Sequence, residues 1–138
     1  MMSSRLNPYI SYDGNARQAF EFYQAVFGGE LAMNTFGEFG AAEGGGADKI
    51  MHAMLETPQG YTLMGSDTPA ELEFKAGTTM SVSLSGDNAD ELRGFYDKLS
   101  DGGTVTMPLE KQMWGDEFGM VNDQFGVTWM INIAQPQS

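Results

Sequence analysis

The stretch NARQAFEFYQAVFGGELAM, residues 15–33, returns later in the chain as NADELRGFYDKLSDGGTVTM, residues 88–107. Both copies begin with Asn-Ala, carry Phe-Tyr in the middle, reach a Gly-Gly pair and end at a methionine. In the first copy the apolar residues recur at helical spacing: Ala16, Ala19, Phe20, Tyr23, Val26 and Phe27. Each copy therefore predicts an amphipathic helix that packs its apolar stripe against a sheet.

The ends of the two predicted helices carry matching signals. Asn15 and Asn88 are good N-cap residues, and each is followed three positions later by Gln or Glu. Each helix then stops before a glycine pair, Gly28–Gly29 or Gly102–Gly103, where a left-handed C-cap is easiest to form. These signals predict helices over 15–27 and 88–100.

The segments that follow the helices also repeat. ETPQGYTLMGS (56–66) aligns with NDQFGVTWMIN (122–132), so that a glycine, a threonine and a methionine coincide. Tight turns at Pro58–Gly60 and Gln124–Gly126 would join hairpin strands. Alternation predicts one strand before each helix and three after it, over 6–12, 30–36, 49–56, 60–66, 78–85, 104–110, 117–122 and 126–133. The chain thus reads as one α+β domain of two βαβββ modules, 1–66 and 78–138, joined by a linker over 67–77.

Longer pieces of the chain resemble the PhnB-like branch of small bacterial proteins within the vicinal oxygen chelate superfamily, which includes glyoxalase I and the extradiol dioxygenases. The matching pieces are PYISYDGNARQAFEFYQAVFGGE, DKIMHAML, LMGSD and GGTVTMPLEKQMWGDEFGMVNDQFGVTWMIN. They cover nearly the whole chain except 38–47 and 67–77. The resemblance implies a curved, mostly antiparallel eight-stranded cup around a cavity, and a homodimer, for which Phe36, Phe39 and Phe118 are exposed apolar candidates.

In the metalloenzymes of that superfamily, four strands each supply one His or Glu to a divalent metal ion. Transferred residue by residue, these places fall on Pro8 or Tyr9, Met64, Ser81 and Met130. None of them offers the carboxylate or imidazole that such an ion requires. We therefore expect the usual metal site to be missing and no cofactor to be bound. Thioethers would suit Cu(I), but the 11 methionines are explained more simply by packing.

One face of several predicted strands is small, uncharged and weakly polar. It carries Thr62, Met64 and Ser66, then Ser81, Ser83 and Ser85, and in the last strand Thr128, Met130 and Asn132. This face is either the solvated side of an antiparallel sheet or the lining of a neutral cavity. We favour the cavity, because solvated faces usually carry Lys, Glu or Arg. The candidate pocket residues are Tyr9, His52, Met64, Ser81, Ser83, Trp114, Thr128 and Met130, and the expected ligand is a small neutral or weakly polar molecule.

Two of these candidates have competing roles. His52, the only histidine, alternates with Ile50 and Met54, and it is either a structural residue or an acid–base or ligand-contacting group. Trp114 lies in MPLEKQMWGDEFG (107–119), which is either a loop that closes over a pocket mouth or a hairpin loop with the Trp packed underneath.

Charge and composition exclude several classes of partner. The net charge of −12, with only seven Lys and Arg residues, opposes binding to nucleic acid or anionic membranes. The sequence has no apolar run of membrane-spanning length and no signal-peptide segment. The absence of cysteine fits a cytoplasmic protein.

Three functions remain open at this point. The first is a metal-free small-molecule-binding protein, or an enzyme whose reaction the sequence does not specify. The second is a metal-dependent lyase, isomerase or dioxygenase, and the third is a non-catalytic dimeric interaction protein. Relatives of the PhnB-like branch are often labelled as demethylubiquinone methyltransferases, but the chain has no glycine-rich strand-to-helix turn that would hold a nucleoside cofactor.

Overall fold

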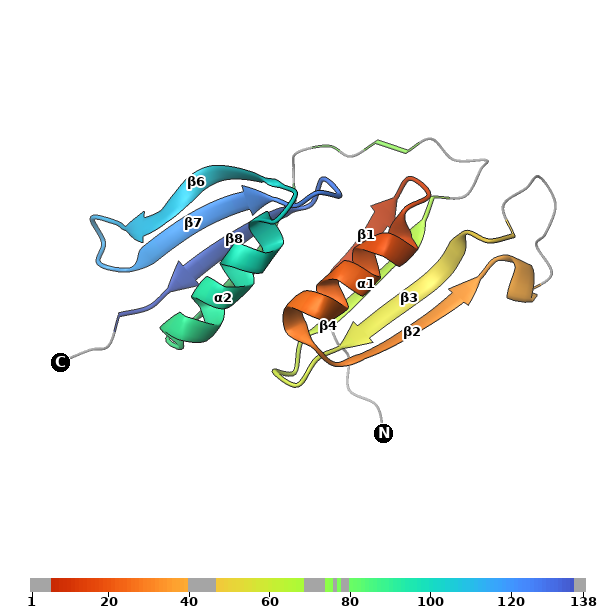
Figure 1. The fold of residues 1–138 in the computed structure, drawn as a ribbon, viewed down its shortest axis with the longest axis horizontal. Helices are drawn as coiled ribbons and strands as arrows, with labels where there is room; N and C mark the ends of the chain where they lie inside the picture. The colour runs from red at the N-terminus through yellow and green to blue at the C-terminus, as the bar shows by residue number, and fades with distance from the viewer. Residues whose placement is uncertain (1–5, 40–46, 69–73, 76, 78–79, 136–138) are drawn as a thin grey trace. The chain divides into compact units, whose positions relative to one another are not determined.

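The computed structural model describes residues 6–39, 47–68, 74–75, 77 and 80–135, which divide into two compact units, Met1–Ala76 and Gly77–Ser138. The first unit contains β1 (Tyr9–Tyr12), α1 (Ala16–Phe27), β2 (Glu30–Thr35), the short 3-10 helix η1 (Gly37–Phe39), β3 (Ile50–Glu56) and β4 (Thr62–Asp67). The second unit contains β5 (Val82–Gly86), α2 (Ala89–Ser100), β6 (Thr104–Lys111), β7 (Glu117–Asn122) and β8 (Thr128–Ile133). Both follow the predicted order of one strand, one helix and three strands (Figure 1).

The strands form two four-stranded sheets with the same topology. Their orders are β1-β4-β3-β2 and β5-β8-β7-β6. In each sheet the strand before the helix pairs in parallel with the last strand, and the remaining pairs are antiparallel. The α+β, mostly antiparallel fold is therefore confirmed, with the eight strands divided equally between two sheets that do not close on themselves.

Each helix covers one face of its own sheet. The predicted apolar stripe of α1 is buried, and α1 contacts β2, β3 and β4, while α2 contacts β5, β7 and β8 (Figure 1). The strand residues that meet the helices are buried apolar side chains: Tyr12, Ala53, Leu55 and Leu63 in the first unit, and Leu84, Val121, Trp129, Ile131 and Ile133 in the second. Burial of these side chains is the main source of stability. We call the opposite side of each sheet its helix-free face.

The glycine pairs explain why the helix ends repeat. Gly28 caps α1 with a φ of 78°, and a Cβ on Gly29 would lie 2.1 Å from the carbonyl oxygen of Glu56. A Cβ on Gly103 would lie 2.3 Å from the carbonyl oxygen of Asn122. In both units the chain that leaves the helix therefore passes against the end of the third strand, where only glycine fits.

The turns between the last two strands also match. The backbone N–H of Tyr61 donates to Thr57 Oγ1 at 3.1 Å, and that of Val127 donates to Asp123 Oδ1 at 3.1 Å. Gly60 and Gly126 both have a φ of 90°. The two predicted tight turns are confirmed, and Thr57 and Asp123 hold them in the same way.

The N-terminal caps differ from the prediction. Asn88 accepts a hydrogen bond from the backbone N–H of Glu91 at 3.2 Å, as expected. Asn15 occupies the N-cap position of α1 but makes no side-chain cap hydrogen bond. The carboxylate of Asp67, which is 1% exposed at the end of β4, instead accepts from the backbone N–H of Ala16 at 2.9 Å.

Some element boundaries are also corrected. β1 begins at Tyr9 rather than at residue 6, and β5 begins at Val82 rather than at residue 78. β4 extends to Asp67, the first residue of the predicted linker, and most of the rest of 67–77 lies outside the described residues. A register shift opposite Asn34 and Thr35 separates Ile50 from the alternation of β3, so Ile50 is buried in the core while His52 and Met54 are not.

Candidate functional site

The helix-free face of the first sheet carries a row of mainly apolar side chains across its four strands. Tyr9 pairs with Met64, Met64 pairs with Met54, and Met54 pairs with Ala32. Residues directly opposite each other on neighbouring strands have side chains in contact range. The register therefore places two adjacent methionines at the centre of this face, with the Tyr9 ring, 53% exposed, at one edge.

A second row on the same face is polar. His52 pairs with Asn34 on β2, and because Ala53 pairs with Gly65, His52 lies opposite Ser66 on β4. The rings of Tyr9 and His52 approach each other across β4, with centroids 5.9 Å apart and planes tilted by 32°. Three sequence-predicted site residues, Tyr9, His52 and Met64, are thus brought together on one face.

The helix-free face of the second sheet has a similar central row. Ser83 pairs with Met130, Met130 with Met120, and Met120 with Met107. The Oγ of Ser81 donates to the Sδ of Met130 at 3.1 Å. The predicted residues Ser81, Ser83 and Met130 therefore share this face.

Thr128 completes the predicted set in the second unit. Its Oγ1 donates to Oδ1 of Asn122, the residue that it faces on β7, at 2.7 Å. This hydrogen bond crosses the strands on the same face as Met130, because residues 128 and 130 project to the same side of β8. The hydroxyl proton of Thr128 is thus engaged within the sheet, while its oxygen can still accept a hydrogen bond from a ligand.

The two faces are equivalent at their centres. Met54 pairs with Met64 in the first sheet, and Met120 pairs with Met130 in the second. In this register the first-strand position beside the methionine is Tyr9 in one unit and Ser83 in the other. By this register the counterpart of Tyr9 is Ser83 and that of Pro8 is Val82, whereas the sequence alignment places Ser81 there.

Trp114 lies at the tip of the hairpin between β6 and β7. The hairpin is closed by a hydrogen bond from the backbone N–H of Gln112 to the carbonyl of Asp116 at 2.8 Å. The Trp114 ring is 59% exposed and packs edge-on against Phe118, with centroids 6.1 Å apart. The loop is thus a hairpin, but the Trp lies beside Phe118 and is not packed underneath.

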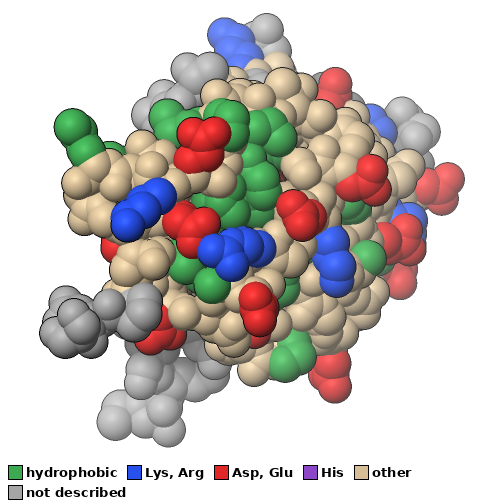
Figure 2. Space-filling model, turned by 60° about the vertical axis from the view of Figure 1, so that its left-hand side comes forward, with side chains coloured by type: hydrophobic (Ala, Val, Ile, Leu, Met, Phe, Trp, Pro, Cys, Tyr) green, Lys and Arg blue, Asp and Glu red, His purple; other side chains and the backbone are tan. Residues whose placement is uncertain are grey.

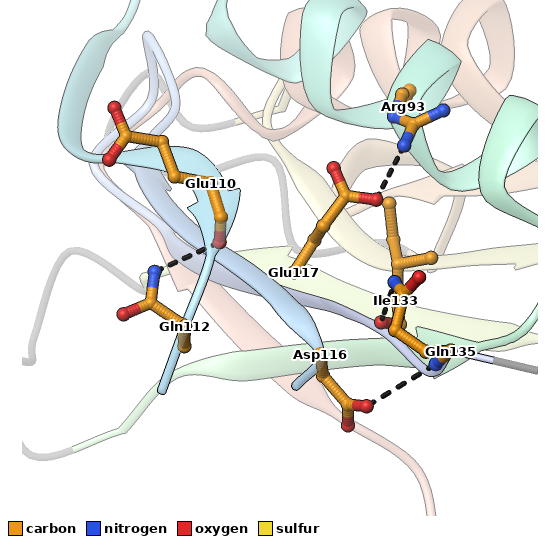
Figure 3. Close-up of polar contacts among 7 residues, drawn as sticks. All are labelled: Arg93, Glu110, Gln112, Asp116, Glu117, Ile133 and Gln135. Carbon is orange, nitrogen blue, oxygen red and sulfur yellow. Dashed lines mark hydrogen bonds and ion pairs between the residues drawn. The ribbon is translucent and has the colours of Figure 1, made fainter. Parts of the chain in front are cut away.

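Polar contacts fix this hairpin to the rest of the second unit (Figure 3). The Asp116 carboxylate accepts from the backbone N–H of Gln135 at 3.3 Å, as Figure 3 shows. It also accepts from the side-chain amide of Asn132 at 3.0 Å. Arg93 on α2 forms an ion pair with Glu117 at the start of β7. The hairpin loop that contains Trp114 is therefore fixed in position by the contacts of Asp116 and Glu117.

The donor set on these faces does not fit a divalent metal ion. The register positions closest to the superfamily places are Tyr9, Met64, Ser83 and Met130, which lack carboxylates and imidazoles. Across residues 6–39, 47–68 and 80–135, no group of three or more His, Asp or Glu side chains lies close enough to hold such an ion. A hard cation requires oxygen or imidazole ligands, so the residues present offer it no cage.

Charged side chains lie at the margins of the faces. Glu30 and Glu56 pair directly with each other at one end of the first helix-free face. On the side of the molecule shown in Figure 2, Lys and Arg side chains lie singly among Asp and Glu side chains. Within the described residues, no helix is long and apolar enough to cross a membrane.

Several residues of these faces are not among the pocket residues predicted from the sequence. Met54, Met120 and Asn34 lie beside predicted residues in the register, and Phe118, predicted only as a dimer contact, lies on the same face as Met120. The repeat contained the signal for two of them, because Met54 precedes Met64 by as many residues as Met120 precedes Met130. His52 and Phe118 occupy the same place in this alignment. The first face therefore has an imidazole where the second has a phenyl ring.

Comparison with known proteins agrees with this fold. The chain is 29% identical over 144 residues to protein YjdN of Escherichia coli strain K12, covering 96% of this chain and 97% of YjdN. The crystal structure of protein PA1353 from Pseudomonas aeruginosa is 38% identical and superposes with a TM-score of 0.87, covering 97% of this chain and all of that one. The Bacillus cereus PhnB protein, described as a putative 3-demethylubiquinone-9 3-methyltransferase, shares the fold at 23% identity and a TM-score of 0.72, covering 95% and 100% of the two chains.

The family model for the glyoxalase/bleomycin resistance protein/dioxygenase superfamily matches residues 5–131, nearly the whole of both units. The match agrees with the repeated βαβββ order and with the fold that the PhnB-like structure shares. The chain belongs to the glyoxalase/bleomycin resistance protein/dioxygenase superfamily.

Proposed function

We propose that the protein binds a small neutral or weakly polar molecule on the helix-free faces of its sheets. The observation that carries this proposal is the register-matched methionine pair at the centre of each face, Met54–Met64 and Met120–Met130. Around these pairs lie hydroxyl and amide side chains, namely Ser66, Ser83, Thr128 and Asn132. A binding surface of this kind combines apolar contact area with a few polar groups that orient the ligand.

Methionine suits this task because its thioether is flexible and polarizable and can adapt to the outline of a bound molecule. The charged groups nearest to these centres, such as Glu30, Glu56 and Glu110, stand one or more rows away. An uncharged centre offers no counter-ion to a charged ligand. These features favour a neutral molecule over nucleic acid, a membrane surface or a charged metabolite.

The proposal can be tested with a thermal-shift screen followed by methyl NMR. A ligand that binds the native state raises its melting temperature by mass action. In protein labelled at the methionine methyls, a hit should move the signals of Met54 and Met64, of Met120 and Met130, or of all four. The methyls of Met80 and Met113, which are highly exposed, are internal controls and should stay in place.

A blocking variant sharpens this test. Some hits will move the Met130 methyl signal. Met130→Trp should weaken the binding of these hits at least tenfold, because the larger ring occupies the centre of the second face. Met113→Trp, at a side chain that is 98% exposed on the hairpin tip, is the matched control and should leave binding unchanged. The proposal fails if a library of neutral metabolites at millimolar concentration stabilises nothing, or if hits perturb only the control methyls.

We also propose that the protein works as a homodimer in the cytoplasm. Exposed apolar side chains such as Val105 and Met107 on β6 support a contact with a second copy, and the lack of cysteine fits a reducing compartment. Two of the predicted contact residues, Phe36 and Phe118, are partly buried rather than exposed, and the side chain of Phe39 lies outside the described set. Sedimentation equilibrium should give twice the mass of one chain, and a monomer at micromolar concentration would contradict the dimer.

A further inference from the structure

We infer that Tyr9 and His52, on the helix-free face of the first unit, form a recognition site for a planar neutral molecule that carries a hydroxyl or carbonyl oxygen. This inference rests on the proposed function and names the ligand class for one of the two faces. It starts from a difference between the units: the face of the second unit has Ser83 where the first has Tyr9, and Phe118 where the first has His52.

The geometry provides a stacking surface. Tyr9 stands on β1 and His52 on β3, and their rings meet above β4 with centroids 5.9 Å apart. With 53% of Tyr9 exposed, its ring keeps area that a flat molecule can cover. Aromatic rings prefer offset or edge contacts with other aromatic rings, and such contacts stabilise a complex beyond the burial of apolar area alone. The pair therefore favours planar ligands.

The polar groups beside the rings are available to a ligand. Among the described residues, the imidazole of His52, the amide of Asn34 and the hydroxyl of Ser66 have no hydrogen-bond partner, and their side chains are at most partly buried or lie exposed at the surface. A neutral imidazole carries one donor and one acceptor nitrogen, so it can bond either a hydroxyl or a carbonyl oxygen. Ser66 and Asn34 lie on either side of His52 and can bond the same oxygen or a neighbouring group.

The charges on this face select against anions. Glu30 and Glu56 oppose each other on neighbouring strands of the same face, one row beyond Met54. Like charges placed directly opposite repel each other, and their combined field also repels a carboxylate ligand. A neutral hydroxyl or carbonyl compound meets no such penalty.

The test uses His52 as its own reporter, because it is the only histidine in the chain. Its imidazole Cε1–H signal is followed by NMR at constant pH while three matched probes are added: p-cresol, 4-methylbenzoate and 4-methylcyclohexanol. We expect p-cresol to move the signal saturably. The benzoate, which adds negative charge, and the cyclohexanol, which removes planarity, should each bind at least tenfold more weakly.

Two variants separate the contributions of the rings. Tyr9→Leu should weaken p-cresol binding at least tenfold and remove its advantage over 4-methylcyclohexanol. His52→Gln, followed by the Met64 methyl signal, should reduce the preference for p-cresol over toluene. Phe125→Leu, which removes a ring in the turn between β7 and β8, is the control and should leave p-cresol binding unchanged.

Failure of this inference is distinguishable from failure of the proposed function. Equal affinity for p-cresol and 4-methylbenzoate, or unchanged p-cresol affinity in Tyr9→Leu, would overturn the inference. An unmoved His52 signal would also overturn it, while a library hit that shifts the Met120 and Met130 methyls would leave the proposed function standing. If no ligand moves His52 or any of the paired methionine methyls, both proposals fall.

Discussion

Asp67 joins the end of β4 to the first turn of α1, because its Oδ1 accepts a hydrogen bond from the backbone N–H of Ala16 at 2.9 Å. Its Oδ2 accepts a second bond from the backbone N–H of Ile50 at 2.8 Å. The buried carboxylate of Asp67 thus connects the end of β4 to the start of α1 and to the start of β3. Hydrogen bonds to charged groups are each worth about 1.5–3 kcal/mol, and a buried donor left without a partner is costly.

Asp67→Asn should therefore lower the free energy of unfolding by roughly 2 kcal/mol or more, since the amide replaces one acceptor oxygen with a donor. Urea unfolding followed by circular dichroism measures the change. Asp48→Asn, at an exposed position, is the matched control and should stay within about 0.5 kcal/mol of the wild type. If the two variants are equally stable, the structural role given to Asp67 is wrong.

Gly29 and Gly94 should respond in opposite directions to alanine. A Cβ on Gly29 meets the backbone carbonyl of Glu56 at 2.1 Å, and its φ of +102° is unfavourable for alanine. Gly29→Ala should lower stability by about 1–3 kcal/mol. Gly94 lies inside α2 with nothing near its Cβ position, so Gly94→Ala should raise stability by about 0.5–1 kcal/mol. Thermal unfolding of both variants checks the signs, and a stabilising Gly29→Ala would refute the close approach.

The two N-cap asparagines form another matched pair. Asn88→Ala should cost about 1 kcal/mol, because it removes the acceptor for the backbone N–H of Glu91. Asn15→Ala should cost much less, because the Asn15 side chain makes no cap hydrogen bond. The comparison needs only the urea midpoints of the two variants. Equal losses would show that Asn15 also caps its helix in solution.

This pair shows what local sequence could and could not predict. The helices, the strand order and the paired turns follow from periodicity and from turn residues close together in the chain, and they are confirmed. The Asp67 contact at the start of α1 is not a local property. Asp67 lies 51 residues from Ala16 in the sequence and reaches it only because β4 ends beside the start of α1.

The candidate site, too, was predictable from local sequence only in part. Alternation along single strands identified Met64 and Met130 as members of weakly polar faces. Their partners Met54 and Met120 depend on antiparallel register, and the meeting of Tyr9 with His52 requires β1 and β3 to flank β4. The register shift at Asn34 and Thr35 in the β2–β3 pair, which places Ile50 in the core, likewise arises from strand pairing. The sequence of β3 alone gives no sign of it.

Tyr96 should make the stability of the protein depend on pH in the alkaline range. Burial on α2 raises the pKa of Tyr96, and the negative charges of Asp97 and Glu110 raise it further, against the opposing effect of a hydrogen bond from the backbone of Leu109. A pKa that is higher in the folded state means that the folded protein holds the proton more tightly. The resulting stabilisation is fully present below the unfolded pKa of about 10 and is lost as the pH rises through the folded value.

The free energy of unfolding should consequently fall between pH 9 and 11 more steeply in the wild type than in Tyr96→Phe. The variant also loses the hydrogen bond from the Tyr96 hydroxyl to the carbonyl of Met107, at 3.3 Å, so it should be less stable than the wild type at pH 8. The two curves of unfolding free energy against pH should therefore converge as the pH rises. The wild type loses the stabilisation that comes from the raised pKa of Tyr96, and phenylalanine has no such group to ionise. Parallel curves would show that Tyr96 ionises equally easily in the folded and unfolded chains.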